Sequence, residues 1–314
     1  AKYRSKLPQL TGSVFLTDGG IETSLIFLDG IELPYFAAFD LLKSEEGRSA
    51  LRNYYSPYAQ LANDRGLGFV LESPTWRASA DWGEKLGYGK DDLARINRDA
   101  IALMAEIRAQ YETPRSPMVI SGCVGPRGDG YDPGKVMSVD EAQRFHAEQI
   151  DVFATTEADM VTALTMTNVN EAAGLTLAAK AAQMPVAISF TLETDGRLPT
   201  GQTLKDAIAA VDRLSDAAPE YFMINCAHPT HFSNLVNGKD AWTQRIRGIR
   251  ANASKRSHAE LDNATDLDAG DPKELAALYR DMCKRLPSLT VLGGCCGTDH
   301  RHIEQIAIAT AAKA

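Results

Sequence analysis

An apolar run that ends in two adjacent cysteines, VLGGCCGTDH (residues 291–300), predicts a buried strand followed directly by a glycine-flanked cysteine pair. It is the last of eight short apolar or β-branched runs, and longer segments of helical spacing separate them. The predicted strands are residues 13–18, 68–73, 118–122, 159–164, 186–191, 221–226, 245–251 and 289–294. Eight such units without a linker favour one closed α/β barrel, a (β/α)8 TIM barrel, as a single domain over residues 1–314.

Local signals agree with this alternation. Ser138 precedes a helical pattern with Glu141 three residues on, which predicts a capping box. Asp271 precedes Pro272, a residue well suited to a first helical turn. The alternative is a doubly wound open sheet, for which a phosphate-binding G-x-G-x-x-G motif is expected after the first strand. The segment TDGGIET (residues 17–23) does not match that motif.

Composition and net charge restrict the kinds of molecule that this protein can bind. The net charge of −8 disfavours nucleic acid, because phosphate binding needs a basic face. No apolar run approaches the ~18 residues that a membrane span requires, and the first residues lack the apolar core of a secretory signal. Five cysteines are an odd set, which favours thiols kept reduced over a disulfide framework. We therefore expect a cytoplasmic protein that acts on small molecules, without a nucleic-acid or membrane partner.

Three cysteines fall at predicted strand ends. Cys226 closes the sixth strand, and Cys295 and Cys296 follow the eighth. One strand separates the two, so their tips can face a common point at the rim where barrel enzymes place functional residues. Three thiolates suit Zn²⁺, which prefers four tetrahedral ligands and would keep one position open for substrate. Adjacent cysteines seldom bridge to each other. The alternative is that Cys226 is a small buried hydrophobe and that the pair is incidental.

Several motifs resemble the homocysteine S-methyltransferase family. They are DGGIET (residues 18–23), SGCVGPRGDGY (121–131), ISFTLETDGRLPTGQTL (188–204), INCAHP (224–229), RANAS (250–254) and GGCCGT (293–298). The family includes betaine-, S-methylmethionine- and cobalamin-dependent enzymes, some of which serve methionine biosynthesis. The likeness runs in order over nearly the whole chain.

The resemblance implies a zinc-dependent methyltransferase. Cys226, Cys295 and Cys296 would hold zinc, and the sulfur of homocysteine would take the open position. Zinc binding deprotonates a thiol, and the thiolate then attacks the methyl group of a donor with a positively charged sulfur or nitrogen. No catalytic residue beyond this metal-activated substrate is expected. His228 and His231 follow Cys226, but three thiolates and a substrate already fill the metal, so we expect both to be loop residues.

The resemblance also implies substrate contacts. Asp18, Gly19 and Gly20 would hold the amino-acid part of homocysteine, although these residues alone would suit a tight strand-to-helix turn. Asn252 lies in the stretch that resembles the Tyr-Pro-Asn-Ser segment of the family.

Two departures from the family concern the substrate. Leu164 occupies the place of a glutamate that grips the substrate amino group, and leucine cannot accept a hydrogen bond from an ammonium. The end of the second strand reads ESPTWRAS (residues 72–79) in place of a polar family segment. Glu72 could supply the lost carboxylate, or be an exposed rim residue. Trp76 could attract an onium methyl group through its ring face, or pack under the loop.

Three functions remain open from the sequence. The first is methyl transfer from S-methylmethionine, a betaine or another sulfonium to homocysteine or a related thiol. The second is a zinc hydrolase on the same barrel, although three thiolates leave zinc a poor Lewis acid. The third is a binding protein that has lost methyl transfer, for which Leu164 is the support. The sequence does not indicate an oligomeric state.

Overall fold

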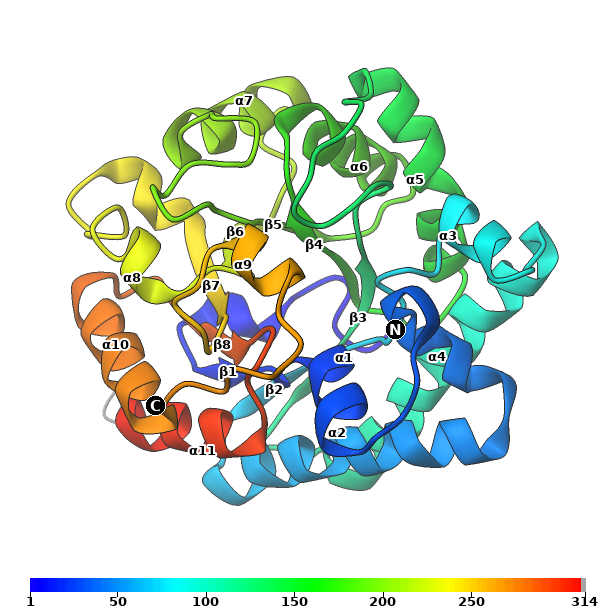
Figure 1. Cartoon of the computed structure of the whole chain (residues 1–314), viewed down its shortest axis with the longest axis horizontal. Helices are drawn as coiled ribbons and strands as arrows, with labels where there is room; N and C mark the ends of the chain where they lie inside the picture. The colour runs from blue at the N-terminus through cyan, green and yellow to red at the C-terminus, as the bar shows by residue number, and fades with distance from the viewer. Residues whose placement is uncertain (312–314) are drawn as a thin grey trace.

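The computed structural model, which describes residues 1–311, closes eight parallel strands into a barrel (Figure 1). Each strand pairs with the next along the chain, and β8 pairs with β1. The strands are β1 (Phe15–Leu16), β2 (Gly68–Glu72), β3 (Met118–Val124), β4 (Met160–Met166), β5 (Val186–Phe190), β6 (Tyr221–Asn225), β7 (Ile246–Ala251) and β8 (Val291–Gly294). All eight lie within or overlap the predicted segments. The closed barrel is confirmed, and the open doubly wound sheet is wrong.

Helices form a ring around the strands (Figure 1). The longer ones are α2 (Glu45–Arg65), α4 (Lys90–Tyr111), α5 (Val139–Ala154), α6 (Val169–Ala181), α7 (Leu204–Ser215), α10 (Pro272–Arg285) and α11 (His300–Ala309). Shorter elements lie in the connections: α1 (Ile21–Thr23), α3 (Ala80–Lys85), α8 (Pro229–Phe232), α9 (His258–Asp262), η1 (Pro8–Thr11), η2 (Ser24–Leu28), η3 (Pro34–Phe36), η4 (Ala38–Lys43) and η5 (Ala241–Arg245). In the part of the chain that is described, no helix combines the length and apolarity needed to cross a bilayer.

The predicted helix starts are confirmed. Ser138 accepts a hydrogen bond from the Glu141 backbone N–H at 3.2 Å, and the Glu141 carboxylate accepts one from the Ser138 N–H at 2.8 Å. The carboxylate of Asp271 accepts from the N–H groups of Lys273 and Glu274 at the start of α10. Each cap satisfies backbone donors that have no partner inside the helix.

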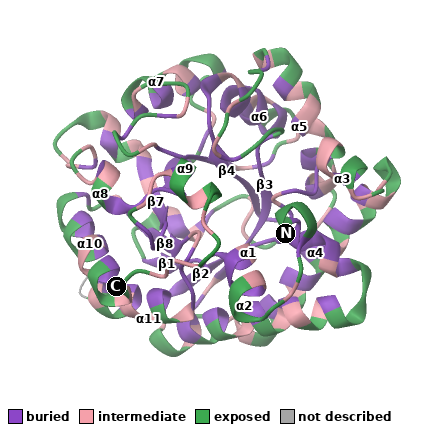
Figure 2. Cartoon of the chain, in the orientation of Figure 1, coloured by how far each residue is buried: buried purple, intermediate pink, exposed green. Residues whose placement is uncertain are grey.

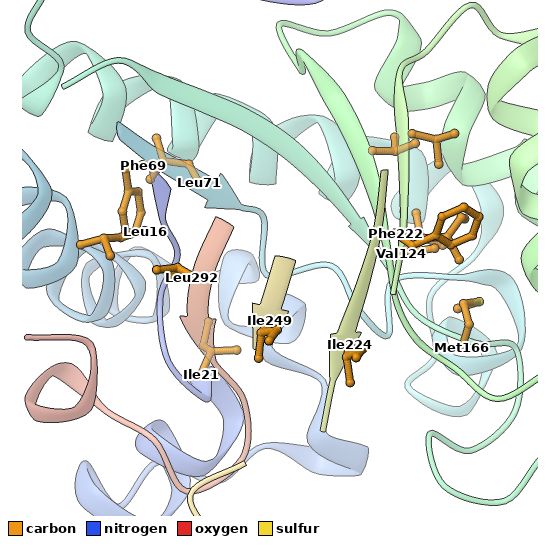
Figure 3. Close-up of a cluster of buried hydrophobic side chains, with 14 of the residues drawn as sticks. Leu16, Ile21, Phe69, Leu71, Val124, Met166, Phe222, Ile224, Ile249 and Leu292 are labelled. Atoms are coloured by element: carbon orange, nitrogen blue, oxygen red, sulfur yellow. The ribbon is translucent and has the colours of Figure 1, made fainter. Parts of the chain in front are cut away.

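The larger apolar core lies between the strands and the helices. Strand side chains that point outward, among them Leu16, Phe69, Ile224, Ile249 and Leu292, pack there (Figure 3). Burial is concentrated in the barrel wall and on the inner faces of the helices, while the outer helix faces are exposed (Figure 2). Each fully buried leucine or phenylalanine contributes about 1.5–3 kcal/mol, so this layer dominates the stability of the ring.

The barrel interior is apolar at the amino ends of the strands. Its members are Leu7, Phe15, Val70, Val119, Met160, Ala187, Tyr221, Met223 and Val291. Leu7 comes from the N-terminal segment, which lies across this end. The Asp159 carboxylate holds that segment in place by accepting from the backbone N–H groups of Lys2 at 2.7 Å and Tyr3 at 2.6 Å.

The next inward layer is polar. Two residues further along the strands, where side chains return to the same face, the inward positions carry Thr17, Glu72, Ser121, Thr162, Ser189, Asn225 and Arg250. Neighbouring members pair, as Ser121 does with Thr162 at 2.7 Å and Ser189 with Asn225 at 2.6 Å. We call this layer the polar floor, because the functional cavity lies directly above it.

Candidate functional site

The loops after β1 and β8 meet in close backbone contact at the carboxyl rim. The Gly20 N–H donates to the Thr298 carbonyl at 3.0 Å, and the Gly294 N–H donates to the Asp18 carbonyl at 3.0 Å. A Cβ on Gly20 would lie 2.5 Å from the Cys295 carbonyl oxygen. Glycine is therefore needed here for backbone approach, and the D-G-G turn is part of the wall that carries the cysteine pair.

The three predicted ligand cysteines converge. Their sulfur atoms all lie within 4.8 Å of one another. Cys226 follows β6 with φ of 53°, a left-handed conformation that is costly for a residue with a side chain. Its N–H donates to the Arg250 carbonyl at 3.1 Å, and the Cys295 N–H donates to Ala251 at 2.9 Å, so β7 positions both residues.

The sulfurs of Cys226 and Cys295 are in direct contact, with Cα atoms 5.5 Å apart. The sulfur of Cys296 completes the cluster. Within this cluster the neighbouring Cys295 and Cys296 are not bridged to each other, as expected.

The three sulfurs fit a zinc ion. Tetrahedral Zn–S bonds of ~2.3 Å place ligand sulfurs ~3.8 Å apart, within the 4.8 Å that bounds the cluster, and Cys226 and Cys295 as thiolates would move apart from their present contact to hold the ion. In residues 1–311 this ligand cluster does not include Cys123, His228 or His231. His228 precedes α8 as a loop residue, as predicted, and pairs with Thr230 at 2.8 Å. His231 lies within α8, so the loop prediction is wrong for it, and it pairs with the Lys255 carbonyl at 3.0 Å.

Tyr131 covers the sulfur of Cys296. Its hydroxyl lies 3.7 Å from Cys296 Sγ, and its ring stacks on His258 with centroids 3.9 Å apart. His258 Nε2 in turn lies 2.8 Å from the Cys226 carbonyl. Burial raises the pKa of the Cys296 thiol to about 11, while the Tyr131 hydrogen bond opposes this. The sequence stretch around Tyr131 was part of the family resemblance, but nothing singled out this side chain.

A cavity of about 290 Å³ opens between the triad and the polar floor. Of the predicted substrate residues, Asp18, Gly19, Gly20, Glu72 and Trp76 line it, together with Leu164 and all three cysteines. Asn252 follows β7 and is buried behind this lining. Its side-chain oxygen has no hydrogen-bond partner within residues 1–311.

Glu72 is only 4% exposed, so the alternative of a solvated rim carboxylate is wrong. It points inward from the end of β2. Burial raises its pKa to about 7, and the positive charge of Arg250 partly opposes the shift. Its Oε2 atom has no hydrogen-bond partner among the residues described.

Arg250 is a site residue that the sequence did not single out. It projects inward from β7, where Nε donates to the Gly294 carbonyl at 3.0 Å and Nη2 donates to Gly19 at 3.1 Å. Nη2 also lies 2.9 Å from Asp18 Oδ1. Burial lowers the pKa of Arg250, but the charges of Asp18 and Glu72 outweigh this and raise it. The only sequence signal was its inward register in RIRGIRA (residues 245–251).

Two further features shape the mouth of the cavity. Glu22, which the sequence did not suggest, lines it, and burial raises its pKa to about 7. The Arg77 guanidinium lies between two rings, 4.2 Å from the centroid of Trp76 and 3.6 Å from that of Trp82. Trp76 therefore already has one cation against its ring, and its Nε1 donates to the Leu164 carbonyl at 3.4 Å.

Comparison with known proteins agrees with this geometry. Residues 15–310 match the family model described as homocysteine S-methyltransferase. A selenocysteine Se-methyltransferase of Brassica oleracea var. italica is 23% identical over 94% of this chain and 88% of its own length. Homocysteine S-methyltransferase 2 of Arabidopsis thaliana is 20% identical over 94% and 92%.

Solved structures show the same fold. The oxidized form of the homocysteine methyltransferase MmuM from Escherichia coli aligns with a TM-score of 0.75 at 18% identity, covering 97% of each chain. Its metallated form aligns with a TM-score of 0.72 at 18% identity, covering 94% of this chain and 96% of that one.

Proposed function

Because the chain belongs to the homocysteine S-methyltransferase family, we propose that it methylates homocysteine or a related thiol at a zinc ion held by Cys226, Cys295 and Cys296. The methyl group would come from a small onium donor such as S-methylmethionine, a betaine or another sulfonium. One observation carries the proposal: three sulfurs from two strand ends converge on the wall of a buried cavity. We place the protein in the cytoplasm, where thiol ligands are kept reduced.

Zinc, when bound, would supply the acceptor sulfur as a thiolate at neutral pH. The acceptor thiolate forms a new S–C bond to the donor methyl carbon, and the methyl–onium bond breaks. Its electron pair stays on the leaving thioether or amine, which departs neutral, and the thiol proton passes to solvent. No oxidant or reductant is consumed.

The loops and side chains of the protein position the two reactants and exclude water from the cavity. Gly19 and Gly20 bring the β1 loop against the cysteine pair, which narrows the cavity around the reacting atoms. Asp18 and Glu72 supply negative charge near an acceptor, and Asn252 lies behind the wall with an unpartnered oxygen among residues 1–311. Holding two reactants in line is itself a large part of the acceleration in such transfers.

Trp76 is proposed to contact the donor. Its ring lines the cavity, and a ring face attracts an onium methyl group by about 0.5–2 kcal/mol. Arg77 lies against the same ring, so the donor must use surface that Arg77 leaves uncovered.

The test is a product assay. Zinc-loaded protein is given a panel of thiols and onium donors, and the methylated thiol is followed by mass spectrometry. A Cys295→Ala, Cys296→Ala double variant, which lacks two ligands and whose fold is checked by circular dichroism, is the matched control. Methylated product that depends on the intact triad supports the proposal. Equal product from the variant, or none from any thiol and donor pair with the native protein, contradicts it.

A further inference from the structure

Two buried groups of opposite charge face the cavity from the polar floor. In the described part of the chain, Glu72 Oε2 and Arg250 Nη1 each lack a hydrogen-bond partner. Both residues line the same cavity as the cysteine triad. Glu72 is 4% and Arg250 5% exposed, so bulk water does not satisfy either. Buried polar atoms are rarely left unpaired, and a pair of opposite charge in one cavity points to a ligand that bears both charges.

The Arg250 guanidinium is held rigidly, which suits a receptor. Its Nε and Nη2 donate to the carbonyls of Gly294 and Gly19, on the two loops that carry the triad and the D-G-G turn. These bonds leave Nη1 as the remaining edge. A guanidinium is always charged, and Nη1 can donate its two N–H groups to the oxygens of a ligand carboxylate.

Asp18 is not free to neutralise a substrate ammonium alone. Its Oδ2 accepts from the Tyr54 hydroxyl at 2.9 Å, and its Oδ1, which accepts no hydrogen bond within residues 1–311, forms an ion pair with Arg250 Nη2 at 2.9 Å. The charge of Asp18 is therefore compensated inside the protein. Leu164 on the facing wall offers no carboxylate. Glu72, whose Oε2 has no internal partner in residues 1–311, is the remaining anion of the floor.

We propose that Arg250 and Glu72 form the clamp for the acceptor, with Arg250 binding its carboxylate and Glu72 its ammonium. This rests on the proposed function and adds the two residues of this chain that would recognise the amino-acid part of the acceptor. Each end of the zwitterion meets a buried group of opposite charge, while the thiol reaches toward the triad. Glu72 and Arg250 come from β2 and β7, which β1 and β8 separate. The ammonium and the carboxylate of the ligand would therefore contact residues on different strands.

The test is thiol selectivity by calorimetric titration of the zinc-loaded protein at mildly alkaline pH. The probes are homocysteine, 4-mercaptobutanoate, which lacks the ammonium, 3-aminopropanethiol, which lacks the carboxylate, and propanethiol, which lacks both. Arg250→Met should weaken homocysteine and 4-mercaptobutanoate about 10- to 100-fold and spare the other two, the range for a charged hydrogen bond. Glu72→Gln should weaken homocysteine and 3-aminopropanethiol and spare 4-mercaptobutanoate.

Arg250→Met leaves Asp18 buried without its partner, so this variant could lose binding because it unfolds rather than because it lacks the carboxylate contact. A second variant separates these two causes. The Asp18→Asn, Arg250→Met double variant removes both charges and should show the same loss of selectivity for the carboxylate. Arg247→Met, on the same strand but outside the cavity lining, is the matched control and should bind all four thiols as the native protein does. Zinc content and circular dichroism are recorded for every variant.

Failure of the clamp is distinguishable from failure of the proposed function. If variants at Arg250 and Glu72 weaken all four thiols equally, or leave homocysteine binding unchanged, the clamp is wrong while methyl transfer still stands. If the native zinc protein binds no thiol, the proposed function fails together with the clamp. Selective, opposite losses for the two half-analogues support it.

Discussion

Arg250 Nη2 lies 2.9 Å from Asp18 Oδ1, and this buried ion pair joins the end of β7 to the end of β1 beneath the cysteine triad. This ion pair determines which charged groups of the site remain available to an amino-acid substrate. An aspartate expected to meet the substrate is already balanced by an arginine, so the net charge of the floor is set by Glu72. Removing either partner of such a pair leaves an uncompensated buried charge.

The first prediction concerns this pair. Asp18→Asn alone should lower the free energy of unfolding by about 3 kcal/mol, because Arg250 would keep its charge without a partner. Urea unfolding measures it. The Asp18→Asn, Arg250→Met double variant should be less destabilised than the sum of the two single variants, since both charges leave together. Strictly additive losses would mean that the two side chains do not depend on each other.

The second prediction concerns the metal. We expect one zinc ion per chain, lost when Cys226, Cys295 or Cys296 is replaced by alanine, because two thiolates hold zinc far less tightly than three. Elemental analysis after gel filtration measures the metal content. Cys283→Ala is the control, because Cys283 lies in α10, away from the cluster. This variant should retain its zinc. Full zinc in the Cys295→Ala, Cys296→Ala variant would remove the basis of the site.

The third prediction tests close packing at the rim. A Cβ on Gly293 would collide with the Thr17 side chain. Gly293→Ala should therefore cost about 1–3 kcal/mol of stability and disturb the cysteine loop that follows. Gly128→Ala is the control, because an added Cβ at Gly128 meets nothing within 4 Å and the φ angle of Gly128 lies outside the left-handed region. Thermal unfolding of both variants decides the matter; equal midpoints would show that the rim tolerates the extra atom.

The strands and the triad were predictable because both depend on short-range pattern. Runs such as GFVLES (residues 68–73) end within one residue of the strand end, here Glu72 of β2, and the Cys295–Cys296 pair follows β8 as its spacing indicates. What lies above the rim was not predictable. Tyr131 reaches Cys296 from a loop whose path is set by tertiary contacts, including the stack on His258.

Burial at the site was also out of reach of the sequence. The position of Glu72 at the end of a strand was foreseen, but whether it is exposed depends on the loops that close over it. The partner of Arg250, Asp18, lies just after the first strand, more than two hundred residues earlier in the chain, and no local pattern links them. Local signals therefore predict which residues reach the rim, while the ion pairing among them follows from closure of the barrel.

The fourth prediction concerns the opposite end of the barrel. The Asp159 carboxylate accepts from the N–H groups of Lys2, Tyr3 and Ile120 and from Arg108 Nη1, at 2.6–2.9 Å. Asp159→Asn removes the charge that faces Arg108 and should cost about 3 kcal/mol in urea unfolding. Asp216→Asn is the control, because Asp216 is exposed and its contact with Lys180 at 3.6 Å should contribute under about 1 kcal/mol. Similar losses in both variants would contradict the role of Asp159.

The fifth prediction is the pH dependence of stability that Glu72 imposes. Burial raises the pKa of Glu72 from 4.5 to about 7, although Arg250 nearby and the hydroxyls of Ser121 and Thr162 oppose the shift and Asp18 adds to it. A raised folded-state pKa means that the folded protein holds this proton more tightly than the unfolded chain. Its contribution is therefore fully present below about pH 4.5 and is lost as the pH rises through about 7.

The change amounts to about 3 kcal/mol, from a shift of roughly 2.5 pH units at 1.36 kcal/mol each. Glu72→Gln removes the titration, so it should be more stable than the native protein above about pH 7 and show a flatter profile below it. Urea unfolding of chelator-treated protein gives both profiles without a contribution from metal ligands. Parallel profiles for the two proteins would mean that Glu72 is ionised throughout, and that the polar floor stabilises its charge far better than its burial indicates.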